Sequence, residues 1–252
     1  MIDQESIRKL REMNFSEMVE ILMAQQQDTE ILMEPFDSRL ERAIEYVYTC
    51  KHNNKIARMV NGAKFRFNAN IHDLMYEGRS LDRHMINELS TCSFIRNHTN
   101  IILQGFTGSG KTYIACALGK AACHNQIRTL YIRYEDLILK YEEVKNDDTR
   151  GRTGLAKLIN KFSSIPLLII DEWLMDRLSE EEAHFIFEIV ERRYDTASTI
   201  FCTQYRQSDW LERLGNDTHA EAIMDRIIHN AVTIETGEKN MREALSVTAT
   251  KY

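Results

Sequence analysis

The sequence predicts an α/β fold: a five-stranded parallel sheet flanked by helices and preceded by a small all-helical domain. Three observations predict it. Residues 1–62 carry apolar side chains at helical spacing and show no strand alternation. From residue 101 onward, short apolar runs alternate with helical segments, which is typical of a parallel sheet covered on both faces. Between the first apolar run and the first of these helices stands the glycine-rich stretch GFTGSGKT, residues 105–112.

The helical part of the chain comes first. Apolar residues recur at helical spacing in residues 7–26 and again from residue 36 onward, and Gly62, the first glycine in the chain, marks a helix stop. We therefore predict a helical module over residues 1–68 and a second domain over residues 69–252. The first part of the second domain, residues 69–100, is predicted to be a linker that contains one helix.

Five short apolar runs are predicted to be the strands of the sheet. A helix is expected after the third run, because Ser179 and Glu182 have the spacing of a capping box. The segment between the second and third runs, residues 135–164, is longer than a simple crossover and is expected to form two helices. The five predicted strands are residues 100–105, 128–133, 166–171, 198–203 and 231–236.

The glycine-rich stretch matches the phosphate-binding pattern G-x-x-x-x-G-K-[ST] in full. It follows a predicted strand and precedes a predicted helix, the context in which backbone N–H groups form an anion nest at a helix N-terminus. Lys111 is expected to reach the β and γ phosphates, and the Thr112 hydroxyl to bind Mg²⁺. We expect ATP to contact Gly105, Phe106, Thr107, Gly108, Ser109, Gly110, Lys111, Thr112, Tyr113 and Asp171.

Two carboxylates end the third predicted strand, in the stretch LLIIDEW. Carboxylates are seldom buried without a partner, so packing alone explains this pair poorly. We expect Asp171 to complete the Mg²⁺ site with Thr112, and Glu172 to polarise the attacking water as a general base. The alternative is a strand that simply ends in a solvated turn.

Other candidate catalytic residues follow later in the chain. The fourth predicted strand ends beside the third, so Gln204, or else Thr203, is expected near the γ-phosphate. Ordinary polar residues at a strand end are the alternative. Arg226 is a candidate for an arginine that reaches the γ-phosphate of a neighbouring subunit. An ion pair with Asp225 or Glu221 on its own helix is the alternative.

Composition limits the class of protein. The chain of 252 residues has 43% hydrophobic and 28% charged residues, which is typical of a globular protein. No apolar run approaches the length of roughly 18 residues needed for a membrane span. The five cysteines have scattered spacings without a CxxC pair, which favours free thiols in a reducing compartment. We therefore expect a cytoplasmic protein with no membrane partner.

The net charge of −6 does not by itself indicate nucleic-acid binding, but the charge is unevenly distributed. Residues 38–70 carry seven basic and two acidic residues, and basic residues recur through residues 135–164. Either segment could follow a phosphate backbone, whereas a solvated helix pair is the alternative for the second. The DNA-contact candidates are Lys51, Lys55, Arg58, Lys64, Arg66, Lys140, Lys145, Arg150, Arg152, Lys157 and Lys161.

These motifs, taken in order, resemble the IstB-type transposition helper ATPases of the AAA+ class, which are related to the DnaC-type helicase loaders. The resemblance covers nearly the whole chain, and its most specific stretches are TIFCTQYRQSDW and AEAIMDRIIHN. It implies an ATPase that uses ATP and Mg²⁺, forms a homo-oligomeric ring or spiral on double-stranded DNA, and recruits a cognate transposase. It also implies a sensor-1 role for Gln204 or Thr203 and an arginine-finger role for Arg226.

The chain departs from this family pattern near its C-terminus. Too few residues follow Arg242 for a full helical lid domain, so a full lid is expected to be absent and a sensor-2 role for Arg242 does not follow. Two other functions remain open. A DnaC-like helicase loader would prefer single-stranded DNA. A nucleotide-gated scaffold would use ATP to assemble but turn it over negligibly, which the intact Asp171–Glu172 pair disfavours.

Overall fold

The computed structural model describes residues 2–147, 151–237 and 239–241, apart from the side chains of residues 151 and 152. By its internal contacts, the chain divides into two compact units, Met1–Arg58 and Met59–Tyr252. The sequence places the end of a helical module at residue 68. That functional division remains a prediction.

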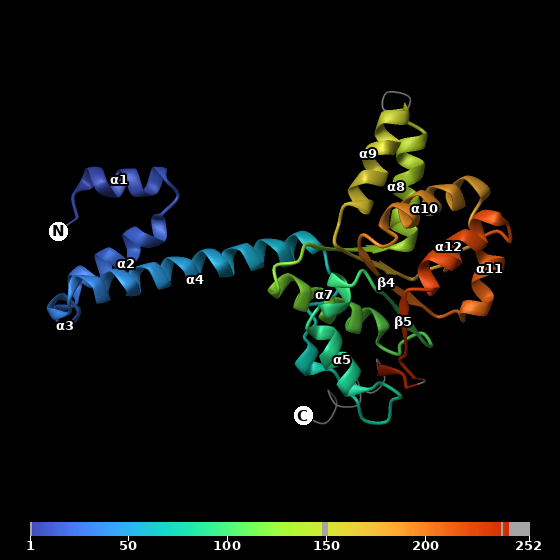
Figure 1. Cartoon of the computed structure of the whole chain (residues 1–252), viewed down its shortest axis with the longest axis horizontal. Helices are drawn as coiled ribbons and strands as arrows, with labels where there is room; N and C mark the ends of the chain where they lie inside the picture. Colours follow the sequence, from blue (N-terminus) through green and yellow to red (C-terminus); the bar gives the residue numbers. More distant parts are fainter. Residues whose placement is uncertain (1, 148–150, 238, 242–252) are drawn as a thin grey trace. The chain divides into compact units, whose positions relative to one another are not determined.

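The described residues of the first unit form helices joined by short connections (Figure 1). Asp3 caps its first helix by accepting a hydrogen bond from the Ser6 amide, and Asp28 caps its third helix in the same way. Val19 and Ala43 are among its buried side chains. The helices are α1 (Gln4–Glu12), α2 (Ser16–Gln27), α3 (Thr29–Met33) and the greater part of α4 (Phe36–Ala63), which continues into the second unit.

The second unit is built on a parallel sheet with the strand order β2-β3-β4-β1-β5. Each strand lies within one residue of a strand predicted from the sequence, and the predicted fold class is confirmed. In the register, Ile101 of β1 lies beside Ile200 of β4 and Val232 of β5. The strands are β1 (Asn100–Gln104), β2 (Thr129–Arg133), β3 (Leu167–Asp171), β4 (Ser198–Thr203) and β5 (Ala231–Glu235).

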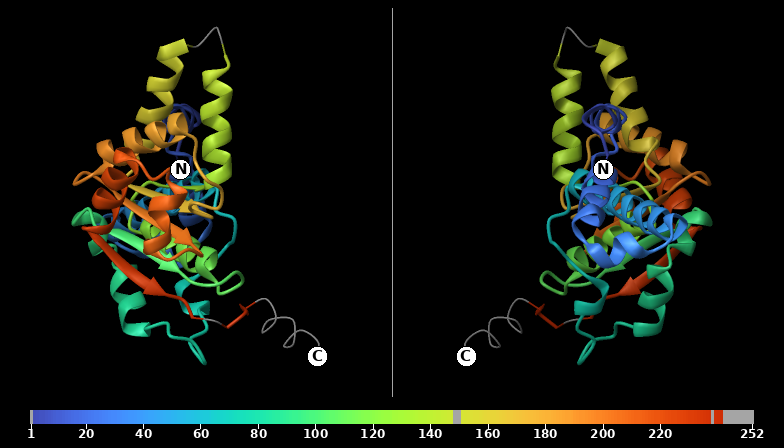
Figure 2. Two further views of the ribbon diagram at one scale, coloured as in Figure 1. Left: turned by 90° about the vertical axis from the view of Figure 1, so that its right-hand side faces the viewer. Right: turned by 90° about the vertical axis from the view of Figure 1, so that its left-hand side faces the viewer.

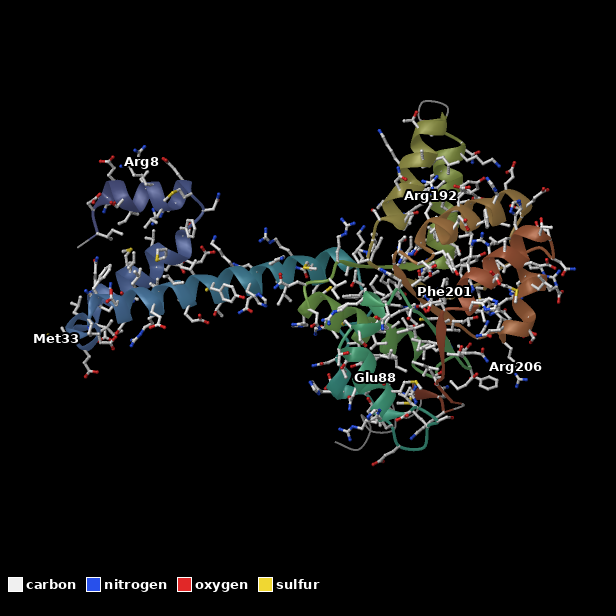
Figure 3. All side chains as sticks on the ribbon, viewed as in Figure 1. Arg8, Met33, Glu88, Arg192, Phe201 and Arg206 are labelled. Carbon is white, nitrogen blue, oxygen red and sulfur yellow. The ribbon has the colours of Figure 1, made fainter. Side chains whose placement is uncertain are left out.

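A hydrophobic core lies on each face of the sheet, and successive strand residues point alternately into one core and the other. Ile101 and Leu103 pack into one core with η1 (Ile71–Asp73), α5 (Arg83–Ser90), α6 (Ser93–Arg96) and α7 (Lys111–His124). Ile102 and Phe201 pack into a second core on the other face; Figure 3 labels Phe201 within it. This second core also takes side chains from the helices α8 (Tyr134–Lys145), α9 (Gly151–Ser163), α10 (Glu180–Arg193), α11 (Trp210–Arg213) and α12 (Thr218–Ile228).

The helices of the second core include two features that the sequence predicts. Ser179 and Glu182 form the expected capping box at the start of α10. The segment between β2 and β3 folds into α8 and α9, which lie side by side and project from the sheet (Figure 2). A short turn, η2 (Gln207–Asp209), precedes α11. Within the described ranges, no helix is both long and apolar enough to cross a membrane.

Candidate nucleotide-binding site

The glycine-rich loop connects the end of β1 at Gln104 to the start of α7 at Lys111. Gly108 and Gly110 have φ values of +84° and +88°, a backbone conformation that residues other than glycine rarely adopt. A Cβ atom on Gly105 would lie 2.3 Å from the Thr236 hydroxyl, so this position also requires glycine. The loop therefore has the tight curvature that a phosphate-binding loop needs, and it leads into the N-terminus of a helix.

Lys111 lies across this loop. Its Nζ donates to the carbonyl oxygens of Gly105 at 2.7 Å and of Phe106 at 2.8 Å. The ammonium group is thus held over the space that the loop encloses, where the β and γ phosphates are expected.

Asp171, at the end of β3, is buried with 1% of its surface exposed and is well supplied with donors. The Thr112 hydroxyl lies 2.9 Å from its Oδ2, and the Tyr131 hydroxyl donates to the same oxygen at 2.7 Å. Burial, and then the negative charge of Asp171, raise the pKa of Tyr131, which keeps this phenol protonated as a donor. The aspartate is therefore fixed against the first turn of α7.

This pair of residues fits a magnesium ion. Mg²⁺ prefers hard oxygen ligands, and the Thr112 hydroxyl and the Asp171 carboxylate supply such oxygens from two elements that meet at one point. Thr112 and Asp171 are accordingly the residues that would hold the ion.

Glu172 follows directly but has a different environment. Its φ value of +58° lies in the left-handed region, which turns the chain sharply after β3. Its side chain is 36% exposed, and two guanidinium groups face it. Arg66 Nη1 lies 3.2 Å from Oε1, and Arg133 Nη1 lies 3.9 Å from Oε2. The sequence predicts that Arg66 contacts DNA. In the structure, its guanidinium instead lies within hydrogen-bonding distance of Glu172, the proposed general base.

The structure separates the two sensor candidates at the end of β4. The Thr203 hydroxyl is buried, donates to the carbonyl of Trp173 at 3.2 Å and accepts from the Tyr205 amide at 3.1 Å. Gln204 is exposed, and its Oε1 accepts a hydrogen bond from the Thr107 hydroxyl at 2.9 Å. Gln204 therefore reaches the glycine-rich loop, while the polar group of Thr203 is used in packing.

A cavity of about 520 Å³ adjoins the loop and α7. Pockets of this size accommodate small-molecule ligands such as a nucleoside. Sequence reasoning did not identify most of its walls, because Phe67, Asp73, Leu74, Met75, Arg79 and Met241 lie outside the motifs. No short pattern marks these residues; they lie near the loop only through the fold.

Arg79 is a further residue that the motifs did not reveal. Its Nη2 donates to the Ser109 carbonyl at 2.5 Å and its Nε donates to the Thr236 carbonyl at 3.3 Å. Burial lowers the pKa of this guanidinium. Arg79 thus joins the glycine-rich loop to the segment that follows β5, whose Met241 amide donates to the Gly108 carbonyl at 2.8 Å.

Arg226, the candidate arginine finger, lies in α12 and pairs with Glu191 of α10 rather than with Asp225 or Glu221. Its guanidinium lies 5.2 Å from the centre of the Phe187 ring. Asp225 is engaged by His229 on the same helix. The pairing partner comes from another element, so the sequence of α12 alone could not identify it.

The DNA-contact candidates have diverse surroundings. Lys51 donates to the Asn14 carbonyl and lies near Glu17, so it contributes to packing within the first unit. Lys145 pairs with Glu181. Lys55, Arg58, Lys64 and Lys157 are exposed, Lys161 is exposed beside the Phe162 ring, and Lys140 is partly buried. Arg150, the side chain of Arg152, and Arg242 with the region of a possible lid lie outside the described residues.

The chain is similar to proteins named for ATP binding and for insertion sequences. Residues 8–249 match the model of the family described as IstB-like ATP binding protein. A protein of Sinorhizobium fredii, named as the insertion sequence ATP-binding protein y4pL, is 35% identical over 200 residues, which are 79% of this chain and 80% of that protein. A protein of Pseudomonas fluorescens, named as the ATP-binding protein of insertion sequence IS1162, is 31% identical over 69% of this chain and 74% of its own length.

Among solved structures, the crystal structure of the DnaC helicase loader is similar in fold. It superposes with a TM-score of 0.57 at 24% identity, over 69% of this chain and 99% of that chain. At this identity the likeness concerns the fold alone. Together with the family match, it confirms the prediction of an ATPase with the AAA+ P-loop fold. The chain belongs to the IstB-like ATP binding protein family.

Proposed function

We propose that this protein is the ATP-dependent helper of an insertion-sequence transposition system. It would assemble on duplex DNA with ATP, hydrolyse ATP, and recruit and stimulate the transposase of its element. The observation that carries the proposal is the convergence of Thr112, Asp171 and Gln204 at the glycine-rich loop in a member of this family. The names of its relatives, which refer to insertion sequences and ATP binding, support the same role.

In the proposed mechanism, the loop amides and Lys111 bind the phosphates and compensate their charge. Mg²⁺ held by Thr112 and Asp171 would supply charge stabilisation at the β and γ phosphates. Glu172 would accept the proton of the attacking water. Gln204, held beside the loop by Thr107, would orient that water or the γ-phosphate.

The proposal assigns Arg226 to the active site of a neighbouring subunit. Within its own chain its described contacts are with α10 and α12, not with the glycine-rich loop. An arginine that completes a site from the next subunit makes hydrolysis depend on assembly. Duplex DNA would promote assembly through exposed basic residues of α4, of the α8–α9 pair, and of the connector between α4 and η1 (residues 64–70).

Steady-state phosphate release tests the proposal directly. We expect multiple turnovers by the wild-type protein, stimulation by duplex DNA more than by single-stranded DNA, and no turnover by Lys111→Ala. A single turnover without further release would instead indicate a scaffold that uses ATP only to assemble. Stimulation by single strands alone would indicate a helicase loader. A transposase gene beside the gene for this protein, and ATP-dependent co-sedimentation of the two products, would support recruitment.

A further inference from the structure

Arg66 occupies a position that neither the phosphate-binding motif nor the proposed mechanism uses. Its Nη1 lies 3.2 Å from Oε1 of Glu172, within hydrogen-bonding distance, and 3.9 Å from Oδ2 of Asp171. It therefore places one positive charge against both carboxylates of the active site, across 106 residues of sequence.

The side chains that precede and follow Arg66 in the sequence contact α7. The Phe65 ring packs so closely on Gly119 that a Cβ at Gly119 would lie 2.6 Å from it. The Phe67 ring lies 6.3 Å from the ring of Tyr113, and the Lys120 ammonium donates to Asn68 Oδ1 at 2.8 Å. These contacts on both sides hold the connector against the helix that starts at the phosphate-binding loop, so the position of Arg66 over Glu172 is built into the fold.

The second arginine near Glu172 is engaged elsewhere. Arg133 forms a two-point interaction with Asp136, from Nε at 3.0 Å and from Nη2 at 2.8 Å, and its Nη1 remains 3.9 Å from Glu172 Oε2. Charge-assisted hydrogen bonds of normal length are much stronger than contacts at such distances. Arg66 is thus the stronger of these two restraints on the glutamate.

We propose that Arg66 is a positioning residue that restrains Glu172 through this contact, so that ATP turnover requires its guanidinium to leave Oε1. The inference rests on the general-base role proposed for Glu172. A carboxylate oxygen that accepts a hydrogen bond from a guanidinium is less available to accept one from water. Arg66 also faces Asp171. Mg²⁺ held by Asp171 would offset the negative charge that attracts the Arg66 guanidinium, and so would weaken the restraint on Glu172.

The restraint predicts that removing Arg66 helps the reaction. In Arg66→Gln, kcat/KM measured without DNA should rise and ATP·Mg²⁺ should bind more tightly. Together the two effects should amount to a change of roughly threefold, the size expected when a partly exposed ion pair is removed. ADP binding should change less. Arg96→Gln is the matched control: it is the same substitution and removes the same charge, but from an exposed arginine at the end of α6, and its values should match the wild type. Arg66→Lys retains a positive charge near Glu172, so its kcat/KM and ATP affinity should lie between those of the wild type and Arg66→Gln.

A double-mutant cycle supplies a readout that is independent of catalysis. Thermal unfolding is measured for the wild type, Arg66→Gln, Glu172→Gln and the double variant, first without nucleotide and then with saturating ATP·Mg²⁺ at a temperature where turnover is negligible. We expect the two substitutions to be non-additive without nucleotide and additive with it. A pair that is merely structural would stay non-additive in both conditions.

Three results would overturn the proposal. Additive effects without nucleotide would show that the contact carries no coupling. Weaker binding of ATP by Arg66→Gln, with ADP binding unchanged, would make Arg66 a γ-phosphate ligand instead. Unchanged kcat/KM and ATP affinity would make the contact incidental. Failure of the base assignment is detected separately, because Glu172→Gln alone would then hydrolyse ATP at the wild-type rate.

Discussion

Thr107 and Gln204 are joined by a hydrogen bond in which the threonine hydroxyl donates to Gln204 Oε1 at 2.9 Å. This interaction links the loop that is expected to bind phosphate to the end of β4. The adjacent Thr203 faces the interior instead, where its hydroxyl donates to the Trp173 carbonyl. Two neighbouring residues thus have separable roles, one at the loop and one in the packing of the sheet.

Substitutions at these two positions should have different consequences. Gln204→Ala should lower kcat by roughly tenfold or more while leaving thermal stability nearly unchanged, because Gln204 is exposed. Thr203→Val should instead reduce the free energy of unfolding by about 1–3 kcal/mol, because it leaves buried backbone groups without their partner. Denaturant unfolding and phosphate release on both variants check this. Equal losses of activity without loss of stability would assign the sensor role to Thr203 as well.

Glu172→Gln should separate binding from hydrolysis. The amide keeps the size of the side chain but cannot act as a base, so hydrolysis should fall by about 10²-fold or more while ATP still binds. The variant should also trap the assembled DNA complex. Phosphate release and fluorescent-nucleotide binding measure the two properties. Hydrolysis at the wild-type rate would refute the assignment of Glu172.

Arg226 can be tested by mixing variants. Arg226→Ala and Glu172→Gln should each hydrolyse poorly alone, the former by a loss on the order of 10³-fold. An equimolar mixture should regain activity, because intact Arg226 of one variant can complete the intact loop of the other. Glu191→Gln is the control, since it breaks the same ion pair but retains the arginine. A mixture as inactive as its components would argue against action between subunits.

The basic residues near the end of α4 should determine the salt dependence of DNA binding. Neutralising Lys55, Arg58 and Lys64 together should weaken duplex binding and reduce the slope of log K against log salt by up to about 0.9 for each phosphate that the protein no longer neutralises. Lys51→Gln should mainly affect stability of the first unit, because Lys51 pairs there with Glu17. An unchanged slope in the triple variant would mean that this segment faces protein rather than DNA.

The sequence was most informative where structure depends on local patterns. The strands follow from short apolar runs. The capping box at Ser179 and the glycine-rich loop are local motifs, each of which favours one backbone conformation. The motifs also indicated which strand ends would meet, since parallel strands share one edge. Thr112 and Asp171 therefore came together as predicted, although their roles toward Mg²⁺ remain proposals.

Interactions between distant segments could not be predicted in the same way. Arg66 looked like one member of a basic stretch, but packing of Phe65 on Gly119 brings it to Glu172. Arg79 reaches Ser109, and Arg226 reaches Glu191, each through tertiary packing that leaves no periodic signal. The sequence also left Gln204 and Thr203 as alternatives, because the direction of a side chain at a strand end depends on the turn that follows.

In the proposed function, ATP bound at this loop controls assembly on duplex DNA. Its most direct test is the mass of the protein in solution with ATP or ADP, each on duplex DNA, on single-stranded DNA and without DNA. The proposal predicts large assemblies with ATP on duplex DNA that do not form with ADP or with Lys111→Ala. Assembly on single strands only, or no assembly under any of these conditions, would contradict it.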